Sequence, residues 1–211
     1  MSSFTDKLLS ICSDDISPNQ SKKCIELDYG KLLIKELGSL LEKKNGFYGF
    51  ESALHVFPYE SIDAEMGLID WNKHDLWIAA YKDMALGAFF FAEDIFGNQF
   101  CIKDDLIQIF DPETGSFDQL AANVDEWSKV ILVDYDFLTG YSLANQWQNT
   151  YGKIQPMHRL VPKIPFVLGG EYTLENLYLS PTVESLKFRA SLALQIRDIP
   201  DGVSISIDTE N

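Results

Sequence analysis

The stretch "FFFAEDIFGNQFCIKDDLIQIFDPETG", residues 89–115, contains three apolar runs separated by short acidic turns. The first run is continuously apolar and aromatic, as in a strand that is buried on both faces. Gly-Asn and Asp-Asp pairs interrupt the runs, and "DPETG" closes the unit in a turn that suits Pro112 and Gly115. Apolar runs joined by such short connections predict three strands of an antiparallel meander.

The sequence before this meander predicts one helix and two short strands. Residues 29–46 place leucine and isoleucine on one helical stripe and end in Lys-Lys-Asn-Gly, a favourable helix C-terminus. Residues 53–57, followed by Pro58, and residues 76–81 are apolar runs of strand length. We interpret the first run as a short strand. The second suits either a strand or the first turn of a helix, and we favour the strand.

The sequence after the meander predicts mostly helix. Residues 116–135 and 136–152 carry apolar side chains at three- to four-residue steps, and Gly152 is a suitable stop for the second helix. Residues 159–172 contain two prolines and predict extended chain. Residues 182–198 suit a final helix, and residues 203–207 alternate like a strand. One α+β domain, with its sheet in the middle of the chain, is the simplest account.

Composition bounds the class of protein. The chain has 211 residues, of which 46% are hydrophobic, enough for a sizeable core. The longest apolar stretch, residues 85–92, is far short of a membrane span, and the N-terminus lacks the features of a signal peptide. Cys12, Cys24 and Cys101 are odd in number and lack metal-binding spacing, so we expect reduced thiols and a cytoplasmic protein.

The net charge of −15 is concentrated in the middle of the chain. Residues 51–150 hold 18 acids against four lysines, whereas the sequences on either side are nearly neutral. Such a field repels nucleic acid and attracts basic partners, with a strength that falls as salt rises. The same acidity could instead serve solubility alone, and composition leaves both interpretations open.

The sequence offers little for catalysis or for metal binding. The turn that begins at Asp94 has Phe96 where a calcium loop needs a ligand, and it has no lysine for phosphate. Asp134 and Asp136 form a D-x-D pair, which is short enough to be chance, and Asp136 could equally cap a helix. The histidines lack metal-site spacing, and adjacent acids on a strand point to opposite faces. We therefore expect a protein that is not an enzyme and that uses no cofactor and no metal.

Acids flanked by aromatics predict a protein-binding surface, because interfaces favour aromatic anchors within a charged rim. We assign Phe89, Phe91 and Phe100 to the core and leave Phe96 and Trp71 as candidates for exposure. The candidate partner-binding residues lie on the central strands and the loops that follow them. They are Glu93, Asp94, Phe96, Asp104, Asp105, Asp111, Glu113, Asp118, Asp125 and Glu126.

Several of these stretches together resemble the SUKH superfamily, in particular bacterial relatives of fungal cell-wall-assembly regulators. The resemblance lies in "FFFAEDIFGNQFCI", in "LIQIFDPETG", in a following helix with "EW", and in the entry "NGFYGFESAL". The closing "GGEYTLENLY" and "FRASLALQIRDIPDG" are similar to a C-terminal extension of those relatives. The resemblance covers about residues 30–205.

The resemblance implies a twisted antiparallel sheet of about five to six strands flanked by N- and C-terminal helices. We place this single domain over residues 26–211, after a flexible segment over residues 1–25. Many bacterial members are immunity proteins that bind and block a cognate toxin, often a nuclease with a basic cleft. We therefore expect a basic protein toxin as the partner, with no nucleic acid and no membrane. A regulatory scaffold without a toxin, and a hydrolase with two converging carboxylates, remain alternatives.

Overall fold

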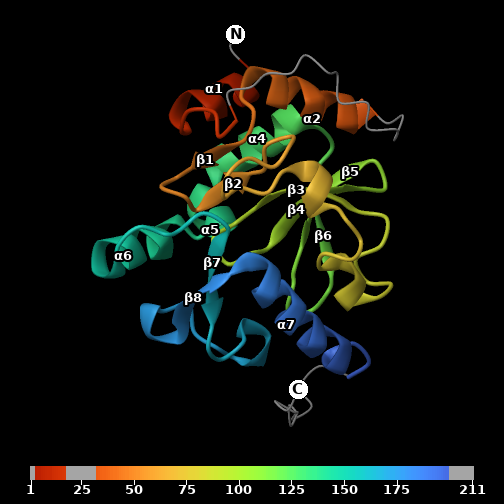
Figure 1. The fold of residues 1–211 in the computed structure, drawn as a ribbon, viewed down its shortest axis with the longest axis vertical. Coiled ribbons are helices and arrows are strands. Elements are labelled where there is room, and N and C mark those ends of the chain that lie inside the picture. The colour runs from red at the N-terminus through yellow and green to blue at the C-terminus, as the bar shows by residue number, and fades with distance from the viewer. Residues whose placement is uncertain (1–2, 18–31, 200–211) are drawn as a thin grey trace.

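The computed structural model describes residues 3–17 and 32–199 of the chain, and its centre is a six-stranded antiparallel sheet (Figure 1). Consecutive strands are neighbours throughout, in the order β1-β2-β3-β4-β5-β6. The strands are β1 (Phe47–Gly49), β2 (Leu54–Val56), β3 (Phe89–Glu93), β4 (Gln99–Lys103), β5 (Leu106–Phe110) and β6 (Phe117–Ala121). The predicted α+β class, with an antiparallel sheet of five to six strands, is confirmed.

Helices precede, interrupt and follow the sheet. They are α1 (Phe4–Ile11), α2 (Leu32–Lys43), α3 (Leu68–Trp71), α4 (Val124–Val133), α5 (Tyr135–Thr139), α6 (Tyr141–Tyr151) and α7 (Thr182–Ile196), with 3-10 turns η1 (Ile78–Tyr81), η2 (Phe166–Leu168) and η3 (Leu174–Asn176). The predicted helices over residues 29–46 and 182–198 are confirmed as α2 and α7. The predicted stop at Gly152 is confirmed at the end of α6.

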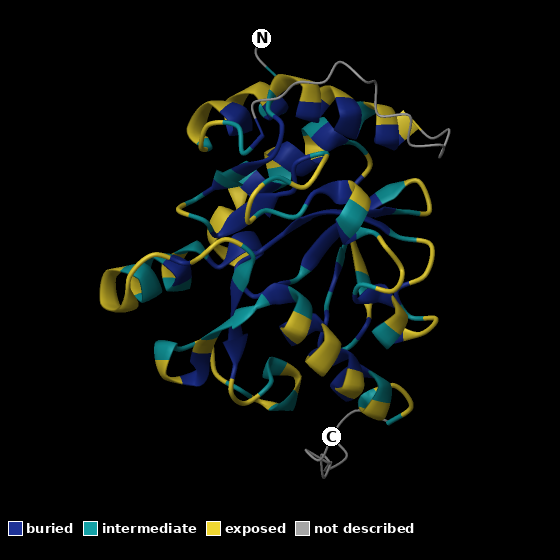
Figure 2. Cartoon of the chain, in the orientation of Figure 1, coloured by how far each residue is buried: buried dark blue, intermediate teal, exposed yellow. Residues whose placement is uncertain are grey.

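The two faces of the sheet are covered by different elements. On one face Trp127 of α4 lies against Phe91 and Phe100, with ring centroids 5.2 and 5.7 Å away, and α1 and α2 pack on α4. On the other face the ring centroids of Trp77 and Phe90 lie 4.7 Å apart, and α7 packs against η1. Figure 2 shows β3 and β4 as deeply buried, whereas β6 at the edge of the sheet is partly exposed.

A second, smaller core lies beside the turn between β3 and β4. The strands β7 (His158–Pro162) and β8 (Leu177–Pro181) form a separate antiparallel pair, at the end of the molecule opposite α1 and α2 (Figure 1). The N–H of Leu160 in β7 donates to the carbonyl of Ile95, which joins this pair to the turn. Phe96, Ile95 and Leu160 are buried together there, against Ala144 of α6.

Residues 76–81 are not a strand, so the favoured interpretation is wrong, and the alternative of a helical turn is the one that the structure shows. The segment contains η1, and its backbone hydrogen bonds are local, such as that from the Ala79 N–H to the His74 carbonyl. The indole N–H of Trp77 donates to the Trp71 carbonyl, and both indole rings are fully buried. The aromatic side chains that made the run look like a strand instead cover one face of the sheet.

The helix predicted from residue 116 begins later than expected. Residues 117–121 form β6, which pairs with β5 so that Asp118 lies opposite Ile109. The helix α4 starts only after Asn123, whose side chain accepts from the Glu126 N–H at 2.8 Å, while Glu126 accepts from the Ala122 N–H at 2.9 Å. The free edge of β5 offers ladder hydrogen bonds, which outweigh the helical propensity of this stretch.

Only part of the predicted flexible segment, residues 1–25, is described. Within it, Leu8 and Leu9 of α1 are buried, and α1 packs against α4. Residues 3–17 therefore belong to the packed structure instead of a loose tail, because the short apolar patch is one face of an amphipathic helix. The predicted strand over residues 203–207 lies outside the described residues.

Candidate functional site

Asp94 organises the turn between β3 and β4. Its carboxylate accepts from the backbone N–H groups of Phe96 and Asn98, both at 2.8 Å, and from the Asn98 side-chain amide at 2.6 Å. The side chain is 2% exposed, and burial raises the pKa of Asp94 to about 7 in spite of these hydrogen bonds. Asp94 is thus a turn-forming residue whose charge changes near neutral pH.

Glu93, the neighbouring acid, points into the molecule. Its carboxylate lies 2.9 Å from Arg159 Nη2 and 3.1 Å from His55 Nδ1, and it accepts from the Gln99 amide. Burial raises the pKa of Glu93, but Arg159 and His55 outweigh that effect and hold it below its usual range. Burial lowers the pKa of His55. The result is an anionic Glu93 and a neutral His55 that join β2, β3 and β7.

The Glu93–Arg159 contact is a charge pair more than an aligned hydrogen bond. Both side chains are fully buried, and the two atoms are close, yet no N–H of Arg159 Nη2 is directed at an acceptor among the described residues. Charge proximity, which has no strict angular requirement, therefore dominates the interaction. The pair links β7 to the main sheet and is a structural element.

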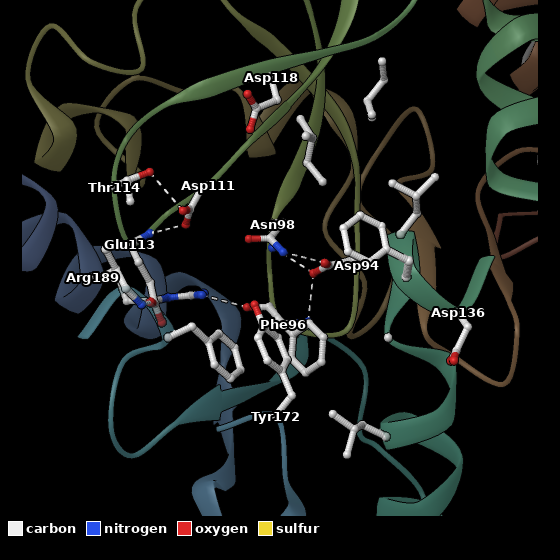
Figure 3. Close-up of a pocket in the computed structure, with 18 of the residues that line it drawn as sticks. Asp94, Phe96, Asn98, Asp111, Glu113, Thr114, Asp118, Asp136, Tyr172 and Arg189 are labelled. Atoms are coloured by element: carbon white, nitrogen blue, oxygen red, sulfur yellow. Dashed lines mark hydrogen bonds between the residues drawn. The ribbon is translucent and has the colours of Figure 1, made fainter. Parts of the chain in front are cut away.

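A cavity of about 730 Å³ opens on the α4–α5 side of the sheet, beyond the end of α4. Ile109 of β5 and Leu120 of β6 form its wall on the sheet, and Leu138 and Leu143 face them from α5 and α6. Most of the lining is apolar. The complete lining, part of which is drawn in Figure 3, is Asp94, Phe96, Asn98, Ile109, Asp111, Glu113, Thr114, Asp118, Leu120, Asp136, Phe137, Leu138, Gly140, Ser142, Leu143, Phe166, Val167, Tyr172 and Arg189.

Acidic side chains reach this pocket from several elements. Asp111 and Glu113 come from the turn between β5 and β6, Asp118 from β6, and Asp136 from α5. Asp118 and Asp136 are exposed, and Figure 3 shows them on opposite sides of the cavity, with Asp94 between them. The carboxylates therefore surround an apolar space without filling it.

Glu113 is the acid with an unmet hydrogen-bonding group. Its Oε2 accepts from the Val167 N–H at 2.9 Å, whereas its buried Oε1 has no hydrogen-bond donor within the described part of the chain. The side chain is 3% exposed, and burial raises the pKa of Glu113, while the hydrogen bond from the Val167 backbone and the charge of Arg189 oppose that shift. A buried acceptor without a donor is costly, which marks Glu113 as a position that a ligand could satisfy.

Arg189, from α7, is the one cation among the described residues that line the pocket. Its Nη1 donates to the Phe96 carbonyl at 2.7 Å, and its Nη2 donates to the Ser185 hydroxyl at 3.3 Å. These bonds fix the guanidinium in the wall. The five carboxyl groups of the lining outnumber this single positive charge.

Three aromatic rings form one end of the pocket. Phe166 and Tyr172 are stacked, with centroids 3.8 Å apart and planes 7° apart, and Phe96 meets both rings edge-on. Tyr172 remains 62% exposed, and Phe137 on the rim is 82% exposed. The pocket thus combines a flat aromatic surface with negative charge.

The structure brings together only some of the predicted partner-binding residues. One pocket is lined by Asp94, Phe96, Asp111, Glu113 and Asp118. We expected surface groups at all five positions, but Asp94, Phe96 and Glu113 are buried in the pocket wall. Phe89, Phe91 and Phe100 are in the core as predicted. Trp71, left as a candidate for exposure, is fully buried.

Five of the predicted residues lie away from the pocket. Glu93 is in the buried charge pair. Asp104 and Asp105 form the exposed hairpin turn between β4 and β5 with positive φ angles of 52° and 58°, at the opposite end of β5 from Asp111. Asp125 accepts from the N–H and hydroxyl of Thr5, which ties α1 to α4. Glu126 caps the start of α4.

Sequence reasoning missed the residues that complete the pocket. Phe166, Tyr172 and Arg189 are distant in sequence from the acids, and no local motif marks them. Asp136 was noticed as part of a D-x-D pair, and its carboxylate accepts from the Ser142 N–H at 2.7 Å, so it caps α6. No group of three or more His, Cys, Asp or Glu side chains within residues 3–17 and 32–199 is arranged to hold a metal ion.

Comparisons with known proteins identify no family for this chain. No family model matches the chain. No curated protein matches it either. A solved structure, that of Atu4351 from Agrobacterium tumefaciens, is similar at a TM-score of 0.47 with 14% identity over 72% of each chain. The resemblance to the SUKH superfamily therefore stays a prediction.

The chemistry that this arrangement supports is recognition of a cation that carries an apolar body. Carboxylates attract the charge, and aromatic and aliphatic walls bury the rest.

None of the helices in the described residues is both long enough and apolar enough to span a membrane.

Proposed function

We propose that this chain is a cytoplasmic binding protein, not an enzyme, that holds a basic protein partner at the acidic pocket. The observation that supports this most strongly is the convergence of five carboxyl groups, from four parts of the fold, on one mainly apolar cavity. Such a site accelerates association with a positively charged surface and orients it on arrival.

The partner that we propose is a toxin, which this protein neutralises by covering its basic active surface. This step rests on the SUKH resemblance and on the electrostatics of the pocket. A nuclease binds phosphate through a basic cleft, and an acidic protein surface can occupy that cleft. A housekeeping protein with a basic surface is the alternative partner, and the protein would then be a regulatory scaffold.

Affinity capture from native cells at low salt tests the proposal when pocket and control variants are compared. In Asp118→Asn/Asp136→Asn two exposed pocket charges are removed, and the asparagine at position 136 can still accept from Ser142. In Glu60→Gln/Asp63→Asn two exposed charges are removed from the loop between β2 and α3, outside the pocket. Asparagine suits the positive φ of 49° at position 63.

The expected result is a basic protein that wild type and the loop variant capture and the pocket variant loses. The captured protein should stop growth when expressed alone, and co-expression of the wild type should restore growth. A captured basic protein that is harmless alone would support the scaffold alternative. Equal capture by the pocket and loop variants would refute binding at the pocket.

A carboxylate hydrolase is the second candidate, because acids with raised pKa values in a cleft are a feature of acid–base catalysis. Asp94 and Glu113 fit that description. Both are engaged, however: Asp94 accepts three hydrogen bonds within its turn, and Glu113 holds the Val167 amide. Turnover of esters or glycosides that Glu113→Gln abolishes would favour the hydrolase over the binding protein.

A further inference from the structure

The pocket selects for a ligand with a long apolar stem and a cationic end. Ile109, Leu120, Leu138 and Leu143 line its sides, and they gain nothing from a small hydrated ion. Arginine and lysine side chains have the required form, since their methylene stems cover apolar surface while their ends carry charge.

The unmet acceptor of Glu113 gives this pocket a specific polar contact. Oε1 is buried and lacks a donor among the residues that the structure describes, while Oε2 is held by Val167. Figure 3 shows Glu113 beside Asp111, at the side of the cavity where Arg189 enters. An N–H donor from a ligand would satisfy an oxygen that is otherwise costly to bury, and a charged donor would satisfy it best.

The aromatic end of the pocket favours arginine over lysine. A guanidinium is flat, stacks on aromatic rings and loses its hydration more readily than an ammonium. The stacked Phe166 and Tyr172 rings offer such a surface, and Tyr172 is largely exposed. Free arginine carries an α-carboxylate and an α-ammonium that would have to lose water beside a mainly apolar cavity, so an arginine within a polypeptide, which lacks both charges, is the better fit.

We propose that the pocket is an anchor site for an arginine side chain of the partner protein, with Glu113 Oε1 accepting from its guanidinium. This inference rests on the proposed function and names the group that the partner inserts. Arg189 does not occupy that place, because the Phe96 carbonyl and Ser185 hold its guanidinium in the wall.

A titration with Nα-acetyl-arginine methylamide, followed by amide NMR shifts, tests the anchor without the partner. The probe has one cationic side chain and no free carboxylate. Saturable shifts are expected at Thr114, Val167 and Tyr172. The lysine analogue should bind more weakly, and the citrulline analogue, which has nearly the same shape without the charge, should produce no saturable shifts.

Glu113→Gln is the decisive variant, and Glu60→Gln is its matched control on an exposed loop. Glutamine can still accept from Val167, and an unchanged spectrum away from the pocket shows that the fold is kept. The probe should bind about tenfold more weakly to Glu113→Gln and equally well to Glu60→Gln, since a hydrogen bond to a charged group is lost only in the first. Equal affinity of both variants, or shifts spread outside the pocket, would overturn the inference.

This test and the capture experiment fail separately. If the arginine probe binds but no basic partner is captured, the anchor stands and the proposed function falls. If a basic partner is captured and Glu113→Gln leaves its affinity unchanged, the proposed function stands and the anchor falls.

Discussion

Replacing Arg159 by methionine should destabilise the protein far more than an exposed ion-pair deletion would. Arg159 and Glu93 are both fully buried, with 2.9 Å between Nη2 and Oε1. At that separation two unit charges attract by about 6 kcal/mol for an effective dielectric constant of about 20. Most of that attraction offsets the loss of hydration, so the pair itself contributes little net stability.

Arg159→Met leaves a buried carboxylate without its main counter-charge, and such a break costs about 3–5 kcal/mol of unfolding free energy. The double variant Glu93→Gln/Arg159→Met removes both charges and should lose less than Arg159→Met alone. Arg197→Met is the matched control, because its partner Asp83 and Arg197 itself are both substantially exposed. That control should lose far less stability than Arg159→Met, because solvent screens an exposed ion pair.

Urea unfolding at pH 8 and at pH 5.5 provides the assay. Arg159 lowers the pKa of His55, so without Arg159 the imidazole binds a proton more readily and partly neutralises Glu93. Arg159→Met should therefore be less destabilising at pH 5.5 than at pH 8. A loss of unfolding free energy below about 1 kcal/mol for Arg159→Met at pH 8 would refute this reasoning. So would a loss in Glu93→Gln/Arg159→Met that equals the sum of the losses in Glu93→Gln and Arg159→Met.

Three further predictions concern the turn, the helix junction and the N-terminal helix. The pKa of Asp94, about 7, lies above its ordinary value of 3.8, so the folded state binds this proton more tightly and loses stability as pH rises from about 4 to about 7. In Asp94→Asn the unfolding free energy measured with urea should therefore change less with pH over that window. An unchanged pH profile would contradict the raised pKa. Gly140→Ala should lower the unfolding free energy by about 1–3 kcal/mol in thermal scans, because φ is +69° and the new Cβ would lie 2.5 Å from Phe96 Cε2. Gly152→Ala, which has open space around it, should lose less in the same scans. Equal losses in the two variants would exclude the clash. Asp125→Ala removes both hydrogen bonds to Thr5 and should lower the unfolding free energy by about 1–2 kcal/mol. Amide hydrogen exchange should become faster in α1 and not in β3–β5. Faster exchange throughout the chain would contradict a local role and show that Asp125 supports the whole fold.

The meander was predictable because its signals are local. Residues 89–115 contain apolar runs of strand length and turns with suitable residues, so pattern alone defines β3, β4 and β5. The strand β6 was not predictable, because "FDQLA" has no strand pattern and becomes a strand only through the free edge of β5. Residues 76–81 show the converse, because they have a strand-like pattern and do not form a strand. An apolar aromatic run is equally suited to cover the face of a sheet.

The acidic region was recognisable from the sequence, but the state of each acid was not. Glu93 and Asp94 look alike in the sequence, yet one meets Arg159 and the other caps its own turn. Glu113 accepts a hydrogen bond from the N–H of Val167, which lies 54 positions away. Side chains that converge only in the folded chain, such as Tyr172 and Arg189, leave no mark on local sequence.

Site-specific photocrosslinking in native cells tests binding at the pocket most directly. A photoreactive residue at Phe137 lies on the pocket rim, and one at Tyr151, which is 63% exposed on α6 and does not line the pocket, serves as the control. We expect a basic protein to crosslink from position 137 and not from position 151, and the crosslink to be lost in Asp118→Asn/Asp136→Asn. The same products from both positions, or crosslinking that survives the loss of the pocket charges, would contradict it.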